Sequence, residues 1–485
     1  MPIMVEREKW ILYKHTCNYE LIKAVALDVK NSCASDISAI ERYRMQERLA
    51  ALDLYKTRNP KDRPLDSINH RINTLEFYMF GYEDDSKRFI FSPLGNLFLN
   101  HINDEEKLKK IFATMLFAIQ FQHWANNTPA SFQLYPFRLL FQLMSEKRLN
   151  FRLYSTEYAY IVAFVHNVNS YSYEKLVNDI LSFRELDDEE KIALLKEDEH
   201  TYVNCIYEWQ YYTQKLLSSV GVISVNEGEP LVKLYHPGKQ NSKSNPTGRT
   251  VRSGYATIAP GIKEFISRLL KEFPCTSVPL RLDDPLRMQL DVVKEIYSFY
   301  PRVLLEEIGE KIDALQVKLL ELPKLIEEYS NNPENDTAYL FENVLTDGMN
   351  MFINVEARKI GGAGHTDIEC LYITKHKKFA VEAKSTSNKL SGINAGRLRE
   401  HRKQIGGEYT IVITSRYVPA AKRDIIGNPI VIILASTFSE YLYNHIYHDV
   451  RDIDYKDFDD IVVNNLGSDI SGLISNMTME KFATK

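Results

Sequence analysis

The sequence predicts a multidomain protein whose first two-thirds are mainly helical and whose last third is an α/β domain with a mixed central sheet. The chain has 485 residues, more than one hydrophobic core usually organises, so about two to four domains are expected. Apolar residues recur at helical spacing through much of 19–330. Between 337 and 434, by contrast, apolar runs of strand length alternate with amphipathic segments.

Composition limits the class of protein. Hydrophobic residues make up 44% of the chain and charged residues 26%, which is typical of a globular protein. No apolar run reaches the roughly 18 residues of a membrane span, and charges interrupt the N-terminal stretch where a signal peptide is apolar. The five cysteines are scattered and form no C-x-x-C pair, which argues against structural zinc and favours a reducing compartment. We therefore expect a cytoplasmic protein with no membrane partner.

Two short apolar runs form the centre of the predicted α/β domain. They are IECLYIT (368–374) and FAVEA (379–383), joined by the polar stretch KHKK (375–378). This pattern predicts an antiparallel hairpin, in which the start of one strand lies beside the end of the next. Asp367 stands at the start of the first strand. Glu382 and Lys384 stand at the end of the second, two residues apart and so on one face. The three side chains are expected to converge.

Two carboxylates and an ammonium group at one sheet edge suit metal-assisted phosphodiester cleavage. Mg²⁺ takes hard oxygen ligands and keeps positions open for water and phosphate. The ion lowers the pKa of a bound water, and a nearby lysine can orient that water or stabilise developing charge. A third carboxylate, Glu342, lies in a predicted helix at 337–352 and could reach the same site.

The alternative for such a trio is a set of solvated charges, which is common at sheet edges. Two features favour a functional site. Glu382 stands inside an apolar strand, where an unpaired charge is costly. Gly361, Gly362 and Gly364 precede Asp367, and glycines let a backbone approach a ligand closely.

These residues resemble the core of PD-(D/E)xK nucleases. The resemblance consists of a helix with Glu342, the stretch GHTD around Asp367, and VEAK with Glu382 and Lys384. A predicted helix at 389–404, an apolar strand and S-R-Y-V follow. This order is similar to the cleavage domain of type IIS restriction endonucleases of the FokI and AlwI kind. Thr366 stands where that family has a proline.

The resemblance implies a Mg²⁺-dependent enzyme that cleaves double-stranded DNA outside a short asymmetric site. It implies that Asp367 and Glu382 bind the metal, that Lys384 serves the nucleophilic water, and that Glu342 is an accessory ligand. It further implies a sheet with helices on both faces, including strands at 409–414 and 429–434. One such site cuts one strand. The enzyme is therefore expected to nick DNA, or to need a second nuclease subunit or a transient homodimer.

Local clusters of positive charge are the candidates for DNA contact, because the net charge of −5 does not indicate nonspecific binding. The segment 236–253 has no acid and is rich in Gly, Ser, Asn and Pro, which predicts a loop. Its cations could neutralise phosphates and its amides could read base edges. The candidates there are Lys239, Gln240, Asn241, Lys243, Arg249 and Arg252, and those on the helix after the site are Arg397 and Arg399. Solvent-exposed positions are the alternative for both groups.

Two stretches in the first part of the chain share one pattern. RFIFSPLGNLFLN (88–100) and GYATIAPGIKEFI (254–266) each run from a strand through Pro into an apolar helix. They resemble the corner that closes a winged helix, although a generic β-to-α corner fits too. The predicted domains are two DNA-recognition subdomains, helical at 1–90 and winged-helix-like at 91–265, a helical linker at 266–330, and a nuclease domain at 331–485. The end of the chain is expected to be a covering helix followed by an acidic extension with little order.

Two other functions fit parts of this pattern. A sequence-specific DNA-binding protein, such as a regulator, could carry an inactive nuclease-like domain. An RNA-selective or structure-selective nuclease would also keep the trio. The intact Asp367, Glu382 and Lys384 favour an active nuclease over the regulator.

Overall fold

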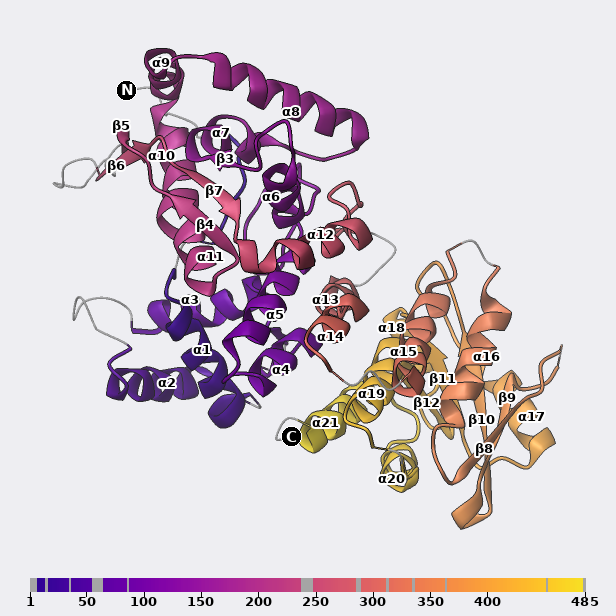
Figure 1. Ribbon diagram of the computed structural model, residues 1–485. Coiled ribbons are helices and arrows are strands. Elements are labelled where there is room, and N and C mark those ends of the chain that lie inside the picture. Colours follow the sequence, from indigo (N-terminus) through magenta and orange to yellow (C-terminus); the bar gives the residue numbers. More distant parts are fainter. Residues whose placement is uncertain are drawn as a thin grey trace. The chain divides into compact units, whose positions relative to one another are not determined.

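The computed structural model (Figure 1) describes most of the chain. The described residues are 7–13, 16–34, 36–54, 64–84, 87–236, 247–284, 289–310, 314–333, 336–362, 364–450 and 452–482. They fall into two compact units, one within Met1–Asp283 and Val292–Glu310 and the other within Asp284–Asp291 and Lys311–Lys485. Within the described ranges, no helix has both the length and the apolarity that crossing a membrane requires. The predicted divisions at 90, 265 and 330 stay predictions.

Helices dominate the first unit. They are α1 (Tyr19–Asp28), α2 (Ala39–Ala51), α3 (Pro64–Phe77), α4 (Pro93–Asn100), α5 (Glu105–Ala118), α6 (Pro136–Ser145), α7 (Ser155–Tyr160), α8 (Ser170–Glu185), α9 (Asp188–Glu197), α10 (Glu199–Glu208), α11 (Gln214–Val220), α12 (Lys263–Glu272), α13 (Gln289–Tyr297) and α14 (Arg302–Glu307). Short sheets lie among them. β1 (Gly81–Glu83) pairs with β2 (Phe89–Phe91), β7 (Tyr255–Ile258) lies between β3 (Leu153–Tyr154) and β4 (Ile223–Asn226), and β5 (Pro230–His236) pairs with β6 (Thr247–Arg252).

Both predicted strand-proline-helix corners are present in the first unit. After β2, the Ser92 side chain caps α4 by accepting from the Gly95 N–H, and Pro93 occupies the first turn. A Cβ on Gly95 would lie 2.0 Å from the carbonyl oxygen of Phe80, so only glycine fits there. After β7, Pro260 begins a 3-10 turn (Pro260–Ile262) that leads into α12 without a side-chain cap. The winged-helix identity of the two regions stays a prediction.

The segment 236–253 is not a loop throughout, which corrects the prediction. Arg249 and Arg252 lie on strand β6, which pairs antiparallel with β5. The β-branched residues Thr250 and Val251 favour a strand, and Val251 is fully buried. The remaining candidates in this segment, Lys239, Gln240, Asn241 and Lys243, lie outside the described residues.

A mixed five-stranded sheet forms the centre of the second unit, as predicted. Its order is β12 (Ile430–Leu434), β11 (Thr410–Thr414), β10 (Lys377–Lys384), β9 (Ile368–Tyr372) and β8 (Val355–Lys359). β9 pairs antiparallel with both β8 and β10, whereas β11 pairs parallel with both β10 and β12. The sheet therefore combines an antiparallel meander (β8–β9–β10) with three parallel strands (β10, β11 and β12) that are joined by crossover connections.

Helices cover both faces of this sheet (Figure 1). They are α15 (Ala314–Asn331), α16 (Ala338–Met349), α17 (Ala395–Ile405), α18 (Pro419–Asp424), α19 (Ala435–Tyr447), α20 (Lys456–Asn464) and α21 (Ser471–Phe482). Alternate β11 residues enter different cores. Ile411 and Ile413 join the larger core with α16 and α19, and Val412 joins the smaller core with α17 and α18. Burial on both faces explains the continuous apolar run of this strand.

Three predicted boundaries were wrong. The hairpin connection lies two residues earlier than predicted, at 373–376 instead of 375–378, because β9 ends at Tyr372 and β10 begins at Lys377. Its last residue, His376, has a φ of +48°. The helix predicted from 389 begins at Ala395, where the Asn394 side chain accepts from the Arg397 N–H and caps it. The acidic extension forms α20 and α21.

Candidate active site

The register of the β9–β10 hairpin brings the predicted trio together. Ile368 pairs with Val381, so Asp367 lies next to Glu382 at the end of the ladder. The Ala383 N–H donates to Asp367 Oδ2 at 2.8 Å. Lys384 Nζ lies 2.6 Å from Glu382 Oε1 and 4.0 Å from Asp367 Oδ2. An ammonium group therefore stands between two carboxylates.

Glu382 is a buried carboxylate that is only half satisfied. Its side chain is 2% exposed. Oε1 faces Lys384 and also Arg397, whose Nη2 lies 3.4 Å away. Oε2 has no hydrogen-bond partner among the described residues. Because an unsatisfied buried carboxylate oxygen is costly, this oxygen is available for a further ligand or donor.

The charge on Asp367 is unfavourable in this structure. Burial, followed by the negative charge of Glu382, raises the pKa of Asp367 to about 6, against the opposing effect of Lys384. A divalent cation between the two carboxylates would remove this repulsion, and carboxylate oxygens are the ligands that Mg²⁺ prefers. Among the described residues, no three His, Cys, Asp or Glu side chains are grouped closely enough to hold a metal ion by themselves. The carboxylate pair fits Mg²⁺ as a partial ligand set, which leaves positions for water and phosphate.

The glycine-rich stretch before Asp367 folds back onto it. Gly361, Gly362 and Gly364 have φ values of +61°, +99° and +91°. Residues other than glycine rarely adopt such positive φ values. The N–H groups of Ile360 and Gly361 donate to the carbonyl oxygen of Asp367 at 2.9 and 3.3 Å. The glycines thus allow a turn that fixes the backbone of Asp367.

Glu342 lies on α16, as predicted, but its direct contact is Lys359. The two side chains form an ion pair at 2.9 Å, and Lys359 Nζ also donates to Asn343 Oδ1 at 3.0 Å. Glu342 remains close enough to contribute to the raised pKa of Asp367. Its assignment as an accessory metal ligand stays a prediction.

Helix α17 supplies two side chains to the site, of which only one was predicted. Arg397 reaches Glu382 Oε1, and His401, one turn further on, places Nδ1 at 3.9 Å from Glu382 Oε2. The i, i+4 spacing of the two residues was the available signal for His401. Arg399 points elsewhere and pairs with Glu400 at 3.6 Å. A pocket of about 360 Å³ adjoins the site, lined by Lys384, Leu390, Gly392, Ile393, Asn394, Arg397 and Leu398.

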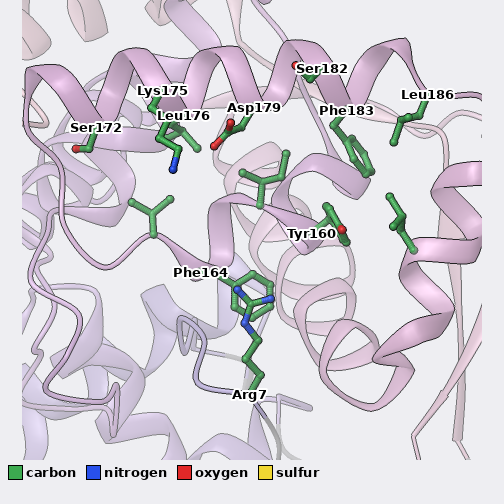
Figure 2. A pocket seen from close by; sticks show the side chains of 13 residues that line it. Arg7, Tyr160, Phe164, Ser172, Lys175, Leu176, Asp179, Ser182, Phe183 and Leu186 are labelled. Carbon is green, nitrogen blue, oxygen red and sulfur yellow. The ribbon is translucent and has the colours of Figure 1, made fainter.

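The two described arginines of the β5–β6 hairpin contact their own unit. The Arg249 guanidinium lies 4.2 Å from the centre of the Tyr207 ring, and its Nη1 donates to the carbonyl oxygen of Gly248. Arg252 Nη1 donates to the carbonyl oxygen of Gly228 at 3.1 Å. Neither arginine lines the pocket of about 700 Å³ in this unit that Figure 2 shows.

We expect Asp367→Asn to stabilise the metal-free protein at pH 8. The pKa of Asp367 is about 6 in the folded protein and 3.8 in a free chain. The folded state is therefore penalised above pH 6, by at most about 3 kcal/mol, and the penalty disappears below pH 3.8, where both states are protonated. Urea unfolding at pH 8 and pH 4 measures this difference. Asp347→Asn, at an exposed position on α16, should change stability by less than about 0.5 kcal/mol at both pH values. An equal effect of Asp367→Asn at both pH values would contradict the explanation.

Comparisons with known proteins identify the family. Residues 5–273 match the family model of the type II restriction endonuclease HgaI, N-terminal domain. The chain is 47% identical over 477 residues to the type II restriction enzyme HgaI of Avibacterium volantium, covering 98% of this chain and 97% of that protein. Among solved structures, the BpuJ1 endonuclease binding domain with modified DNA gives a TM-score of 0.36 at 14% identity, covering 60% of this chain and 95% of that one. Restriction endonuclease FokI gives 0.28 at 10% identity, covering 94% and 99%.

The match to HgaI extends over nearly the whole length of both proteins, so it includes the hairpin with the carboxylate pair as well as the helical first unit. The chain therefore belongs to the HgaI family of type II restriction endonucleases and is a site-specific deoxyribonuclease.

Proposed function

We propose that this restriction enzyme is of type IIS, so that it recognises a short asymmetric site and cleaves outside it with Mg²⁺. The observation that carries the proposal is the convergence of Asp367, Glu382 and Lys384 at one end of the β9–β10 hairpin. The order of glycines, Asp, E-x-K, helix and apolar strand also resembles type IIS cleavage domains. Hydrolysis leaves 5′-phosphate and 3′-hydroxyl ends.

In the proposed mechanism, Asp367 and Glu382 hold the metal ion, and Glu342 is an accessory ligand. Bound Mg²⁺ supplies a more acidic water and neutralises charge on the phosphate. The Ala383 N–H holds Asp367 Oδ2 in place. Lys384 stands between the carboxylates, where its ammonium group orients the attacking water and stabilises the negative charge that develops on the phosphate.

DNA recognition is assigned to the first unit, through winged-helix-like regions and the basic segment 236–253. Lys239, Gln240, Asn241 and Lys243 are the proposed contacts between its strands, with Arg249 and Arg252 on β6. Arg397, beside the carboxylates, and Arg399, exposed on the same helix α17, would contact the DNA backbone near the cut.

A single catalytic trio implies a single cut. The described residues contain one such trio, so cleavage of both strands requires a transient homodimer or a second nuclease subunit. Without either, the protein acts as a nicking enzyme. The protein-to-DNA ratio separates these cases, because dimer-dependent cleavage rises more than linearly with protein concentration.

Incubation of the purified protein with supercoiled plasmid and Mg²⁺, with EDTA as the control, tests the proposal. Cleavage at a fixed offset from a recurring short sequence, found by end mapping, is the expected result. Linear fragments indicate a double-strand cutter, and open circles indicate a nicking enzyme. Cleavage inside the recognised sequence would contradict the type IIS assignment. Specific binding without cleavage in any divalent metal would favour an inactive nuclease-like domain.

We expect Arg249→Ala to weaken DNA binding and to flatten its salt dependence. Each lost phosphate contact lowers the slope of log K against log salt concentration by about one unit. Lys243→Ala should act similarly, whereas Arg249→Lys keeps the charge and should keep the slope. Lys175→Ala provides the control, because Lys175 is exposed at the pocket in Figure 2, away from the predicted contacts. A slope unchanged by Arg249→Ala, measured by fluorescence anisotropy, would make this hairpin an ordinary solvent-exposed one.

A further inference from the structure

Two buried polar atoms at the site face each other and have no other partner. Glu382 Oε2 and His401 Nδ1 are 3.9 Å apart, and neither makes a hydrogen bond in the described part of the chain. The side chains are 2% and 8% exposed, so water does not readily satisfy them. Buried polar atoms nearly always have a partner, and each of these atoms is the nearest candidate partner of the other.

The two oxygens of Glu382 have different surroundings. Oε1 lies on the side of Asp367, since it shares Lys384 with that carboxylate. Both oxygens face α17, but Oε1 contacts Arg397, whereas Oε2 faces His401 one turn later. Leu398, on the same helix, packs into the smaller core and fixes the helix against the sheet. The imidazole of His401 is thus held by a packed helix rather than by a free loop.

We propose that His401 is a positioning residue for Glu382, acting through a hydrogen bond from Nδ1–H to Oε2. This inference rests on the proposed role of Glu382 as a metal ligand. A separation of 3.9 Å exceeds the limit of about 3.2 Å for such a bond, so the bond requires a small rotation of either side chain. Once formed, it fixes the plane of the carboxylate and leaves Oε1 directed toward Asp367.

The proposed arrangement follows a general property of metal sites in proteins. Ligating carboxylates are themselves hydrogen-bonded, and loss of such an outer partner costs about 10-fold to 100-fold in metal affinity or activity. His401 therefore affects the metal only through the orientation of Glu382. The proposed bond also explains why His401 is buried beside a carboxylate in a helix whose other polar residues, apart from Arg402, are exposed.

Substitutions that move the donor by one bond test this inference. His401→Asn places an amide nitrogen close to the position of Nδ1, whereas His401→Gln places it close to the position of Nε2. His401→Leu retains volume without a donor. The measurements on the full-length protein are Mn²⁺ affinity by isothermal titration calorimetry, the Mg²⁺ concentration for half-maximal plasmid cleavage, and the melting temperature.

We expect His401→Leu to weaken Mn²⁺ binding by about 10-fold to 100-fold and to raise the Mg²⁺ requirement by a similar factor, without lowering the melting temperature. His401→Asn should stay within about threefold of the wild type, and His401→Gln should resemble His401→Leu. If His401→Leu does not fold, the contrast between the Asn and Gln variants still decides the matter.

Equal Mn²⁺ affinities of the Asn and Gln variants, or wild-type affinity in His401→Leu, would overturn the positioning role while leaving the metal assignment intact. A wild-type protein that binds no Mn²⁺ would instead overturn the metal assignment, and this inference with it. The two failures are therefore distinguishable.

Discussion

Glu382→Ala is expected to lower Mg²⁺-dependent cleavage by a factor of at least about 10³ and to leave specific DNA binding within about twofold. The substitution removes one of the two main proposed metal ligands, which are Asp367 and Glu382. It also leaves Lys384 and Arg397, which contact Glu382 Oε1, without that counter-charge. Two cations facing an incomplete site disfavour a further cation. Cleavage rates on plasmid DNA and anisotropy with a labelled duplex measure the two effects separately.

Glu369→Ala is the matched control for this experiment. Glu369 lies on β9 of the same hairpin and also pairs with a lysine, Lys378, at 2.6 Å. Its register partner is Ala380, two residues before Glu382, so it stands apart from the trio. The Glu369→Ala variant should therefore keep full cleavage activity. Equal losses in both variants would show that the hairpin is merely sensitive to lost charge, and cleavage that survives Glu382→Ala would remove Glu382 from the site.

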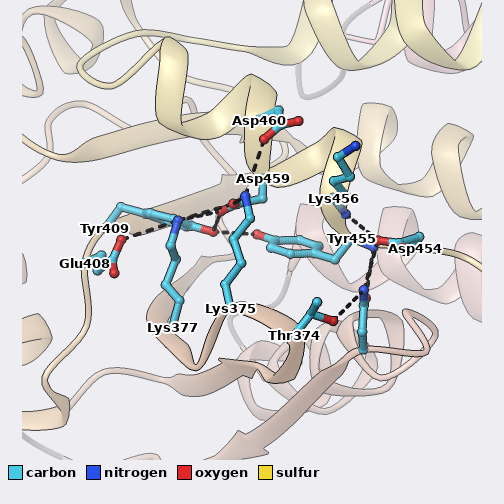
Figure 3. Close-up of polar contacts among 11 residues, drawn as sticks. Thr374, Lys375, Lys377, Glu408, Tyr409, Asp454, Tyr455, Lys456, Asp459 and Asp460 are labelled. Atoms are coloured by element: carbon cyan, nitrogen blue, oxygen red, sulfur yellow. Dashed lines mark hydrogen bonds and ion pairs between the residues drawn. The ribbon is translucent and has the colours of Figure 1, made fainter.

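Asp459→Ala is expected to destabilise the second unit by about 3 kcal/mol. Asp459 is fully buried on α20. It accepts from Lys375 at 2.8 Å, from Lys377 at 3.2 Å and from the Tyr409 hydroxyl at 2.7 Å (Figure 3). Removing one partner of a buried ionic cluster leaves the others unpaired. Lys377 has little access to solvent and would stay unpaired, whereas Lys375 can turn toward solvent. The expected loss of stability is therefore at the lower end of the range of about 3–5 kcal/mol for a broken buried ion pair.

Asp460→Ala is the control, because Asp460 is the next residue, contacts the same Lys375 at 3.4 Å and is about half exposed. It should change stability by less than about 0.5 kcal/mol. Burial alone would raise the pKa of Asp459, but the hydrogen bonds from Lys375, Tyr409 and Lys377 hold this pKa below its usual value. The stabilisation should therefore be present above the pKa of a free aspartate and be lost as pH falls through the lower folded value. Urea unfolding at two pH values tests this, and equal effects of the two substitutions would contradict it.

The β9–β10 hairpin was predictable because its signal is local. The strands are short and apolar, and Glu382 and Lys384 share a face by the period of two alone. Antiparallel pairing then places Asp367 beside them without further information. The parallel strands of the mixed sheet were predicted from the apolar runs of β11 and β12. These strands are buried on both faces, so their sequences are continuously apolar and do not alternate between apolar and polar residues.

Residues whose roles depend on tertiary pairing were not predictable. The acidic stretch of α20 was expected to have little order, because its charges read as solvated. In the folded unit, Lys375 and Lys377 neutralise Asp459, and Phe458 packs in the larger core. His401 has only a weak local signal, its i, i+4 spacing from Arg397, because its partner Glu382 stands 19 positions earlier in the chain and on another element. Likewise, Arg249 was assigned to a loop because its neighbours are small and polar, whereas β6 pairs with β5.

The antiparallel register of β9 and β10 has a consequence for when the two carboxylates come together during folding. A slip of one residue would turn every side chain of a strand to the opposite face. Glu382 would then exchange places with a hydrophobic neighbour, and Phe379 and Val381 would leave the larger core. The same ladder therefore controls both the burial of the core and the meeting of the two carboxylates. A newly made chain therefore brings Asp367 and Glu382 together only after the sheet of this unit has formed in the correct register.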